Sequence, residues 1–113
     1  MADYLFLFYG GGTADMSADE KQTHMQEWGA WMQDLSQQGI FKGGEPLMSE
    51  GMTIRGKDKV VHDGPYPESK ELVGGYIIVS ADSLKKAGEI AKQCPIYITG
   101  GTVEVREISP FPG

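Results

Sequence analysis

The chain has 113 residues, of which 40% are hydrophobic and 23% charged, and these values fit one soluble domain with a single core. A formal net charge of −6 argues against the basic surface that binds nucleic acid, so we expect no nucleic-acid partner. The lone cysteine, Cys94, excludes an intramolecular disulfide, and the sequence shows neither a secretory leader nor an apolar run of membrane-spanning length. We therefore expect a cytoplasmic protein that does not bind membranes.

The first predicted elements are a strand and a long helix. Residues 4–9, YLFLFY, form an unbroken apolar run that is typical of a central strand. A helix is predicted over about residues 18–38, because Ser17 and Glu20 make an S-x-x-E capping box and Gly39 is a suitable stop. Apolar residues three or four apart predict its buried face: Met25, Trp28, Met32 and Leu35.

Short β-prone segments follow the first helix. Residues 53–55 and 59–62 flank a polar GKD turn, so a hairpin is predicted there. The segment GYIIVSA, residues 75–81, is a strong strand candidate.

A second helix and a last strand complete the predicted elements. The helix begins near Asp82, a good N-cap, and ends at Pro95. Its apolar face is predicted from Leu84, Ala87, Ile90, Ala91 and Cys94. Residues 102–108 alternate between apolar and charged side chains, which indicates a strand with one solvated face.

The order of these elements predicts the fold class. Strand, helix, hairpin, strand, helix and strand give an α+β, ferredoxin-like split βαβ fold with an extra short hairpin. Both helices would then cover one face of an antiparallel sheet. The strands are too apolar for the other face to stay bare, so we expect a homodimer that packs sheet on sheet about a twofold axis.

Several segments resemble the YCII-related family, also called the DGPF domain. Four pieces carry the resemblance: residues 63–66 (DGPY), residues 68–71 (ESKE), residues 74–76 (GGY), and Gly101 with residues 103–106 (VEVR). The similarity runs from about residue 52 to residue 108, with a looser match over the first helix and GIFKGGEPL. Tyr66 stands where the DGPF motif has phenylalanine.

The resemblance implies a dimeric α+β barrel with a small-molecule pocket between helices and sheet or near the dimer interface. It implies a single YCII-like domain at residues 1–109, followed by a short Pro-rich tail at residues 110–113. Family members mostly have no established activity, and some DGPF domains accompany extracytoplasmic-function sigma factors. Some members are proposed to use a His–Asp pair, which would correspond here to His24 and Asp63.

The two proposed catalytic residues also have structural readings. His24 lies at the edge of the predicted apolar face of the first helix, so it is either a general base in a pocket or a boundary histidine with one hydrogen bond. Asp63 precedes Gly64-Pro65, so its carboxylate is either part of the pocket or a bond acceptor for backbone N–H groups of that turn.

Five further residues are candidates for ligand binding: Trp28, Arg55, His62, Tyr66 and Lys70. His62 and Asp63 are neighbours, so in a strand their side chains point to opposite faces. Arg55 could hold an acidic ligand or form a surface ion pair, and Lys70 belongs either to a lid or to a solvated loop. Trp28 has the alternative of a place in the core.

We expect no cofactor and no metal. The Gly-rich GGGT segment at residues 10–13 lacks the residues of dinucleotide and phosphate loops, and two His and one Cys lack ligand spacing. Three functions remain: a cofactor-free lyase, isomerase or hydrolase with His24 as base and a small acidic or aromatic ligand; a ligand-binding or regulatory module; and a dimerising interaction domain without catalysis.

Overall fold

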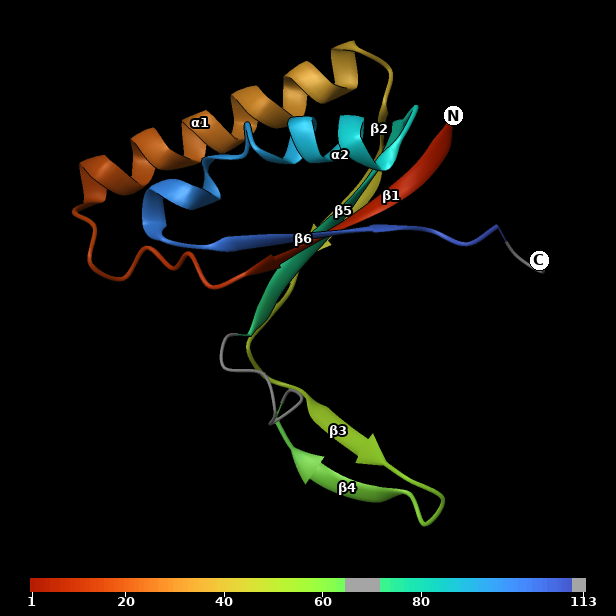
Figure 1. Ribbon diagram of the computed structural model, residues 1–113. Coiled ribbons are helices and arrows are strands. Elements are labelled where there is room, and N and C mark those ends of the chain that lie inside the picture. The colour runs from red at the N-terminus through yellow and green to blue at the C-terminus, as the bar shows by residue number, and fades with distance from the viewer. Residues whose placement is uncertain (65–71, 111–113) are drawn as a thin grey trace.

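The computed structural model of the protein describes residues 1–64 and 72–110 (Figure 1). Six strands, two α-helices and one 3-10 helix follow one another in this part of the chain: β1 Ala2–Tyr9, α1 Ala18–Gln37, β2 Phe41–Pro46, β3 Met52–Arg55, β4 Val60–Asp63, β5 Val73–Ala81, α2 Leu84–Ala91, η1 Pro95–Thr99 and β6 Thr102–Glu107. The predicted strands, helices and hairpin are all present, and their bounds differ from the prediction by a few residues.

The main sheet has four antiparallel strands in the order β2-β5-β1-β6, and both helices lie on one of its faces (Figure 1). This arrangement is the ferredoxin-like α+β fold that the order of elements predicted. Strand β2 was not predicted, because the segment FKGGEP is rich in the residues that strands disfavour.

The central strand β1 separates two different faces of the sheet. Tyr4, Phe6 and Phe8 point toward the helices and are buried. Leu5 and Leu7 alternate with them and stay half-buried on the opposite face. Tyr76 and Ile78 of β5 lie beside these leucines in the strand register, and we call this surface the open face of the sheet.

Helix α1 begins as predicted but buries a different set of side chains. The Ser17 hydroxyl accepts from the Glu20 N–H, and the Glu20 carboxylate accepts from the Ser17 N–H, which completes the capping box. The buried residues are His24, Trp31 and Leu35, whereas Met25 is 67% exposed. The prediction for Met25 was wrong because the buried stripe follows the 24–28–31–35 spacing, which includes a polar residue that an apolar count omits.

Helix α2 starts one residue later than predicted. Ser83, not Asp82, is the N-cap, since its hydroxyl accepts from the Lys86 N–H at 3.1 Å. Leu84 is 56% exposed, against our prediction, while Cys94 is buried in the turn between α2 and η1. Pro95 opens η1, an element that the sequence analysis did not predict.

Strands β3 and β4 form the predicted hairpin, which projects away from the sheet and helices (Figure 1). The chain leaves the main sheet after β2 and returns to it at β5. The Leu47 N–H donates to the Gly74 carbonyl at 2.9 Å, so the β2–β5 ladder continues to the base of the hairpin. The hairpin is therefore an insertion between two strands that are sheet neighbours.

The close packing of β2 on β5 depends on Gly44. A Cβ on Gly44 would overlap the Tyr76 carbonyl oxygen and lie 2.6 Å from the Ile77 Cα, whereas a Cβ on Gly43 would meet nothing within 4 Å. Both residues have a positive φ. A side chain at either position strains the backbone, but only one at Gly44 also forces the two strands apart.

We predict that Gly44→Ala lowers the free energy of unfolding by about 1–3 kcal/mol more than the matched variant Gly43→Ala. Urea unfolding of both variants, followed by circular dichroism, measures this difference. Equal destabilisation by the two substitutions would contradict the close approach of β2 to β5.

Candidate functional site

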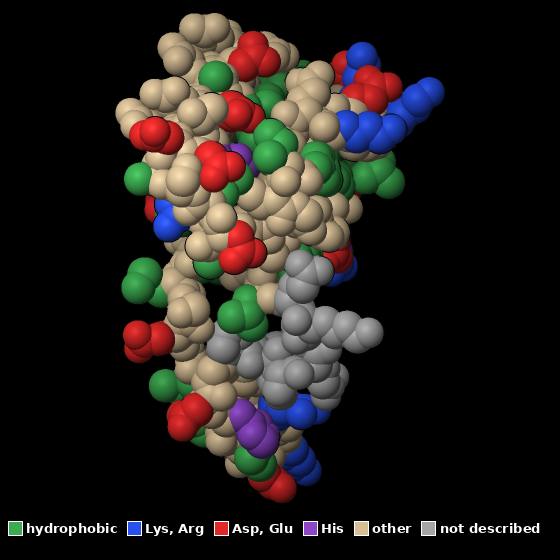
Figure 2. All heavy atoms as spheres, turned by 90° about the vertical axis from the view of Figure 1, so that its left-hand side faces the viewer, with side chains coloured by type: hydrophobic (Ala, Val, Ile, Leu, Met, Phe, Trp, Pro, Cys, Tyr) green, Lys and Arg blue, Asp and Glu red, His purple; other side chains and the backbone are tan. Residues whose placement is uncertain are grey.

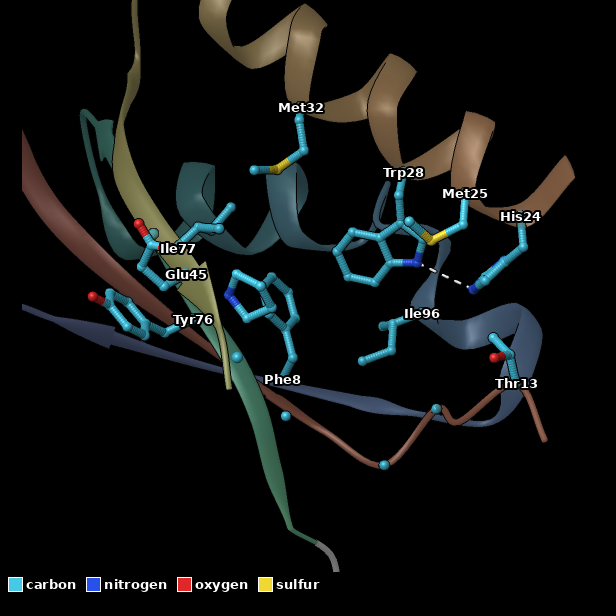
Figure 3. Close-up of a pocket in the computed structure, with 16 residues that line it drawn as sticks. Phe8, Thr13, His24, Met25, Trp28, Met32, Glu45, Tyr76, Ile77 and Ile96 are labelled. Atoms are coloured by element: carbon cyan, nitrogen blue, oxygen red, sulfur yellow. Dashed lines mark hydrogen bonds between the residues drawn. The ribbon is translucent and has the colours of Figure 1, made fainter. Parts of the chain in front are cut away.

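A cavity of about 340 Å3 lies between α1 and the end of the sheet from which the hairpin emerges. Six apolar side chains make most of its wall: Phe8, Met25, Trp28, Met32, Ile77 and Ile96. In Figure 3 the side chains from α1 extend toward Phe8 and Ile96 on the other side of the cavity. Its size and lining are those of a site for one small apolar molecule.

Glycines give the remaining wall a smooth backbone surface. Gly44 and Gly75 lie on the adjacent strands β2 and β5, and Gly10 and Gly11 follow β1. A Cβ on Gly11 would lie 2.6 Å from the Ile96 side chain, so a larger residue would push Ile96 from its place. The glycines therefore keep a flat surface open beside the aromatic rings.

His24 is the buried polar residue of this cavity wall and is only 4% exposed. The Trp28 indole N–H donates a hydrogen bond to His24 Nε2 at 3.1 Å (Figure 3). Because Nε2 accepts this bond, it carries no proton, and the proton of the neutral imidazole is on Nδ1. Nδ1 has no hydrogen-bond partner within residues 1–64 and 72–110.

Ring contacts hold Trp28 against this histidine. The Trp28 ring meets the edge of Phe8 with centroids 5.2 Å apart, and it meets Trp31 at 5.8 Å. Such edge-to-face pairs are favourable, and together they leave the indole N–H directed at His24. The aromatic cluster is therefore the structure that places a hydrogen-bond donor on Nε2.

Polar groups at the cavity are few. Besides His24, Thr13, Glu45 and Tyr76 line it, and neither lysine nor arginine is found in its wall among the residues that the structure describes. An anionic ligand would lack a cationic partner there, so the wall favours an uncharged molecule. A second, open hollow on the outer side of His24 is bordered by acidic residues, including Asp19 and Glu27. Within the described part of the chain, no three His, Cys, Asp or Glu side chains are grouped as metal ligands.

The structure does not bring Asp63 and His24 together within one chain. Asp63 is exposed on β4 of the projecting hairpin and is not part of the cavity wall. The strand register pairs Asp63 with Met52 and His62 with Thr53, so the two neighbours point to opposite faces, as expected. Of the turn whose backbone N–H groups we expected Asp63 to bind, only Gly64 is described, and its N–H donates to the Gly51 carbonyl at 2.7 Å.

The other candidates are divided between the cavity and the hairpin. Trp28 lines the cavity, whereas Arg55 and His62 are exposed on the hairpin. Tyr66 and Lys70 lie outside the described residues. The sequence analysis missed Phe8, Thr13 and Ile96 as cavity residues, although the glycines after residue 9 were a signal that the chain turns close to another element there.

Comparisons with known proteins give a family and, among solved structures, weak likenesses. The sequence model of the YCII-related domain matches residues 3–112. No curated protein matches the chain. Among solved structures, 5-chloro-2-hydroxyhydroquinone dehydrochlorinase from Burkholderia phenoliruptrix AC1100, in complex with 2,5-dihydroxybenzoquinone, is 19% identical, with 93% of each chain covered and a TM-score of 0.47. This likeness transfers neither an activity nor a residue role. None of the described helices is long and apolar enough to cross a membrane.

The single cysteine gives a test of the core beneath α2. Burial raises the pKa of the Cys94 thiol to about 11, so the thiol is protonated at pH 8. We predict that Cys94 reacts with a thiol reagent at pH 8 at least about 100-fold more slowly in the folded protein than in urea. Absorbance of the released reagent measures both rates, and similar rates would contradict the buried position.

Proposed function

The chain belongs to the YCII-related family, and with that premise we propose that it binds a small, flat, hydroxylated ring compound and moves a proton at His24 without a cofactor. The observation that carries this proposal is the unprotonated Nε2 of a buried histidine, held by an indole N–H in the wall of an apolar cavity. The aromatic side chains and glycine backbone suit the flat faces of such a ligand, and a single hydroxyl suits Nε2.

The proton chemistry follows from the geometry of the pair. A ligand hydroxyl can donate to Nε2 only if the Trp28 N–H gives up that acceptor, because one lone pair accepts one strong hydrogen bond. Transfer of the proton to Nε2 then makes an imidazolium, which no longer accepts from Trp28. His24 would thus act as a general base toward a phenolic or carbon acid, which is the first step of a lyase or isomerase.

A matched pair of small ligands tests the binding step. Phenol and toluene have similar shape and differ by a hydroxyl and a methyl group. The phenol O–H can donate to Nε2 while its oxygen accepts the released indole N–H, so we predict that phenol binds the cavity more tightly, by about 1 kcal/mol or fivefold in Kd. Calorimetry measures both affinities. In His24→Ala the preference for phenol should disappear while toluene still binds. Equal affinities in the unmodified protein would contradict recognition of a hydroxyl by Nε2.

Replacement of His24 by asparagine separates binding from proton transfer. Asparagine can accept the Trp28 hydrogen bond but cannot act as a base near neutral pH. We predict that His24→Asn retains phenol binding and lowers any turnover by about 100- to 10,000-fold. Hydroxylated aromatic and enolisable carbonyl compounds, followed in D2O by proton NMR, provide the readout through deuterium incorporation. Exchange at an unchanged rate would remove His24 from the role of base.

One observation favours ligand binding without catalysis as a second function. The lone pair of His24 Nε2 is occupied by Trp28, and no carboxylate hydrogen-bonds to Nδ1 in the described residues. A ligand-binding or regulatory module would use the same cavity with the indole bond intact. Phenol and toluene binding with equal affinity, together with no exchange for any compound, would support that function.

The open face of the sheet supports the homodimer that the sequence led us to expect. Leu5, Leu7, Tyr76 and Ile78 are half-buried there, and the helices cover only the opposite face. A second copy packed sheet on sheet would bury these side chains about a twofold axis. We predict that sedimentation equilibrium at micromolar concentration gives twice the chain mass of 12.3 kDa. A strict monomer would contradict the homodimer.

A further inference from the structure

The β3–β4 hairpin, residues 52–63, has one apolar face, and we call this segment the arm. Cross-strand pairing places Ile54 opposite Val61 and Met52 opposite Asp63, so Met52, Ile54 and Val61 share a face. These three side chains are 66%, 59% and 57% exposed. Val60 lies on the other face of the ribbon, opposite Arg55.

Within residues 1–64 and 72–110, the arm lacks the packing that a two-stranded ribbon needs. Isolated two-stranded hairpins are marginally stable in water, and they become stable when an apolar face packs against another layer. In Figure 1 the arm extends away from the sheet and both helices. The exposed apolar face of this ribbon therefore indicates a partner surface.

The shape of the chain indicates how much surface the partner covers. A compact monomer of 113 residues has a radius of gyration near 13 Å, whereas this chain has 15.8 Å and is 19 Å thick in its thinnest direction. A monomer of 12.3 kDa exposes about 6,100 Å2, whereas this chain exposes 8007 Å2. The excess of roughly 1,900 Å2 lies in the range that each chain of an obligate homodimer buries, about 1,000–2,500 Å2.

Charge favours a second copy of the chain as the partner. The arm carries three Lys and Arg residues against two Asp, whereas the remainder of the chain carries seven basic residues against fourteen acidic ones. Figure 2 shows acidic side chains spread over the helical end of the molecule, and Lys, Arg and His side chains beside an acidic one on the arm. A further group of Lys and Arg side chains lies away from the arm. Two copies related by a twofold axis and lying antiparallel would place each basic arm beside the acidic body of its partner, and opposite potentials favour that contact.

We propose that the arm of each chain clasps a second copy, with Met52, Ile54 and Val61 packed against the part of the partner's open face formed by Leu7 and Tyr76. The parts formed by Leu5 and Ile78 then pack sheet on sheet. This inference rests on the homodimer of the preceding section and adds the element that locks it. The contact is isologous, because the arm and the open face occur once in each chain and are exchanged by the twofold axis. Each chain thereby buries the apolar face of its arm and the open face of its sheet.

Substitutions on the two faces of the arm test the proposal. Val61→Asp and Ile54→Asp place a carboxylate on the apolar face, and Val60→Asp places the same charge on the opposite face of the same ribbon. Sedimentation equilibrium should show that Val61→Asp and Ile54→Asp raise the dissociation constant of the dimer at least tenfold above that of Val60→Asp. A dimer unaffected by Val61→Asp and Ile54→Asp would overturn the role of the arm and leave a sheet-on-sheet dimer. A monomeric unmodified protein would overturn both.

A disulfide between differently tagged chains tests where the arm docks. One chain carries Val61→Cys and the other Leu7→Cys, so a heterodisulfide can join only two copies. The native Cys94 is buried, which keeps it out of the reaction. We expect oxidation to link these chains at least tenfold more than a Val60→Cys chain with the same partner. Equal disulfide yields for Val61→Cys and Val60→Cys with the Leu7→Cys chain would overturn docking on the open face. A disulfide from Val61→Cys to another protein instead of the Leu7→Cys chain would also overturn it.

Phenol binding by the arm variants shows whether the cavity still works when the dimer is weakened. Neither Val61 nor Ile54 lines the cavity, so a folded arm variant should bind phenol within about twofold of the unmodified protein. Loss of binding in every protein, with the dimer intact, would count against the proposed function alone. If Val61→Asp and Ile54→Asp leave the dimer intact and phenol still binds, the result counts against the role of the arm alone.

Discussion

The alternation of side chains along β1 is the constraint on which the rest of the molecule depends. This strand is central, so β5 and β6 pair with both of its edges and neither edge is free. Its rings on one side form the floor on which the helices pack, and Phe8, the last of them, continues into the cavity wall. The intervening leucines make the other side apolar, and no helix among the described residues covers it. The alternation of side chains along six residues of β1 thus determines the core, the cavity wall and the open face.

The relation between His24 and Trp28 gives the cavity its chemical character. A histidine placed among apolar side chains needs a partner, since an unmet polar atom in a buried site costs about 1–3 kcal/mol. Trp28 meets this need at Nε2, four residues along the same helix. The partner is an uncharged donor that cannot accept a proton, so the bond persists only while Nε2 remains unprotonated. A carboxylate in place of the indole N–H would instead favour protonation of His24, because it would stabilise the imidazolium.

The sequence predicts the fold well where local signals and burial agree. The capping box at Ser17 and Glu20, the apolar run of β1 and the alternation of β6 each carry a signal within a few residues, and each is present in the structure. Strand β2 was missed because its pairing with β5 is a long-range interaction that overrides the low strand propensity of Gly43 and Gly44.

The candidate site was harder to predict, and for a different reason. His24 and Trp28 were identified because helical spacing relates residues that are close in sequence. Asp63 and His62 follow a turn, and nothing local states whether a hairpin folds back on its own domain or projects from it. The glycines and Ile96 enter the cavity through tertiary packing, which no window of sequence contains.

The position of the arm between β2 and β5 has a consequence for how such a protein can change over time. Those two strands are hydrogen-bonded neighbours, and the Leu47 N–H still reaches the Gly74 carbonyl where the insertion begins. Lengthening a surface insertion costs little, about 0.6 kcal/mol for each doubling of a flexible loop. Substitutions and insertions can therefore change the length or the charge of the arm without breaking the hydrogen bonds between β2 and β5. The residues that we propose to hold the dimer and those that line the cavity can thus change independently.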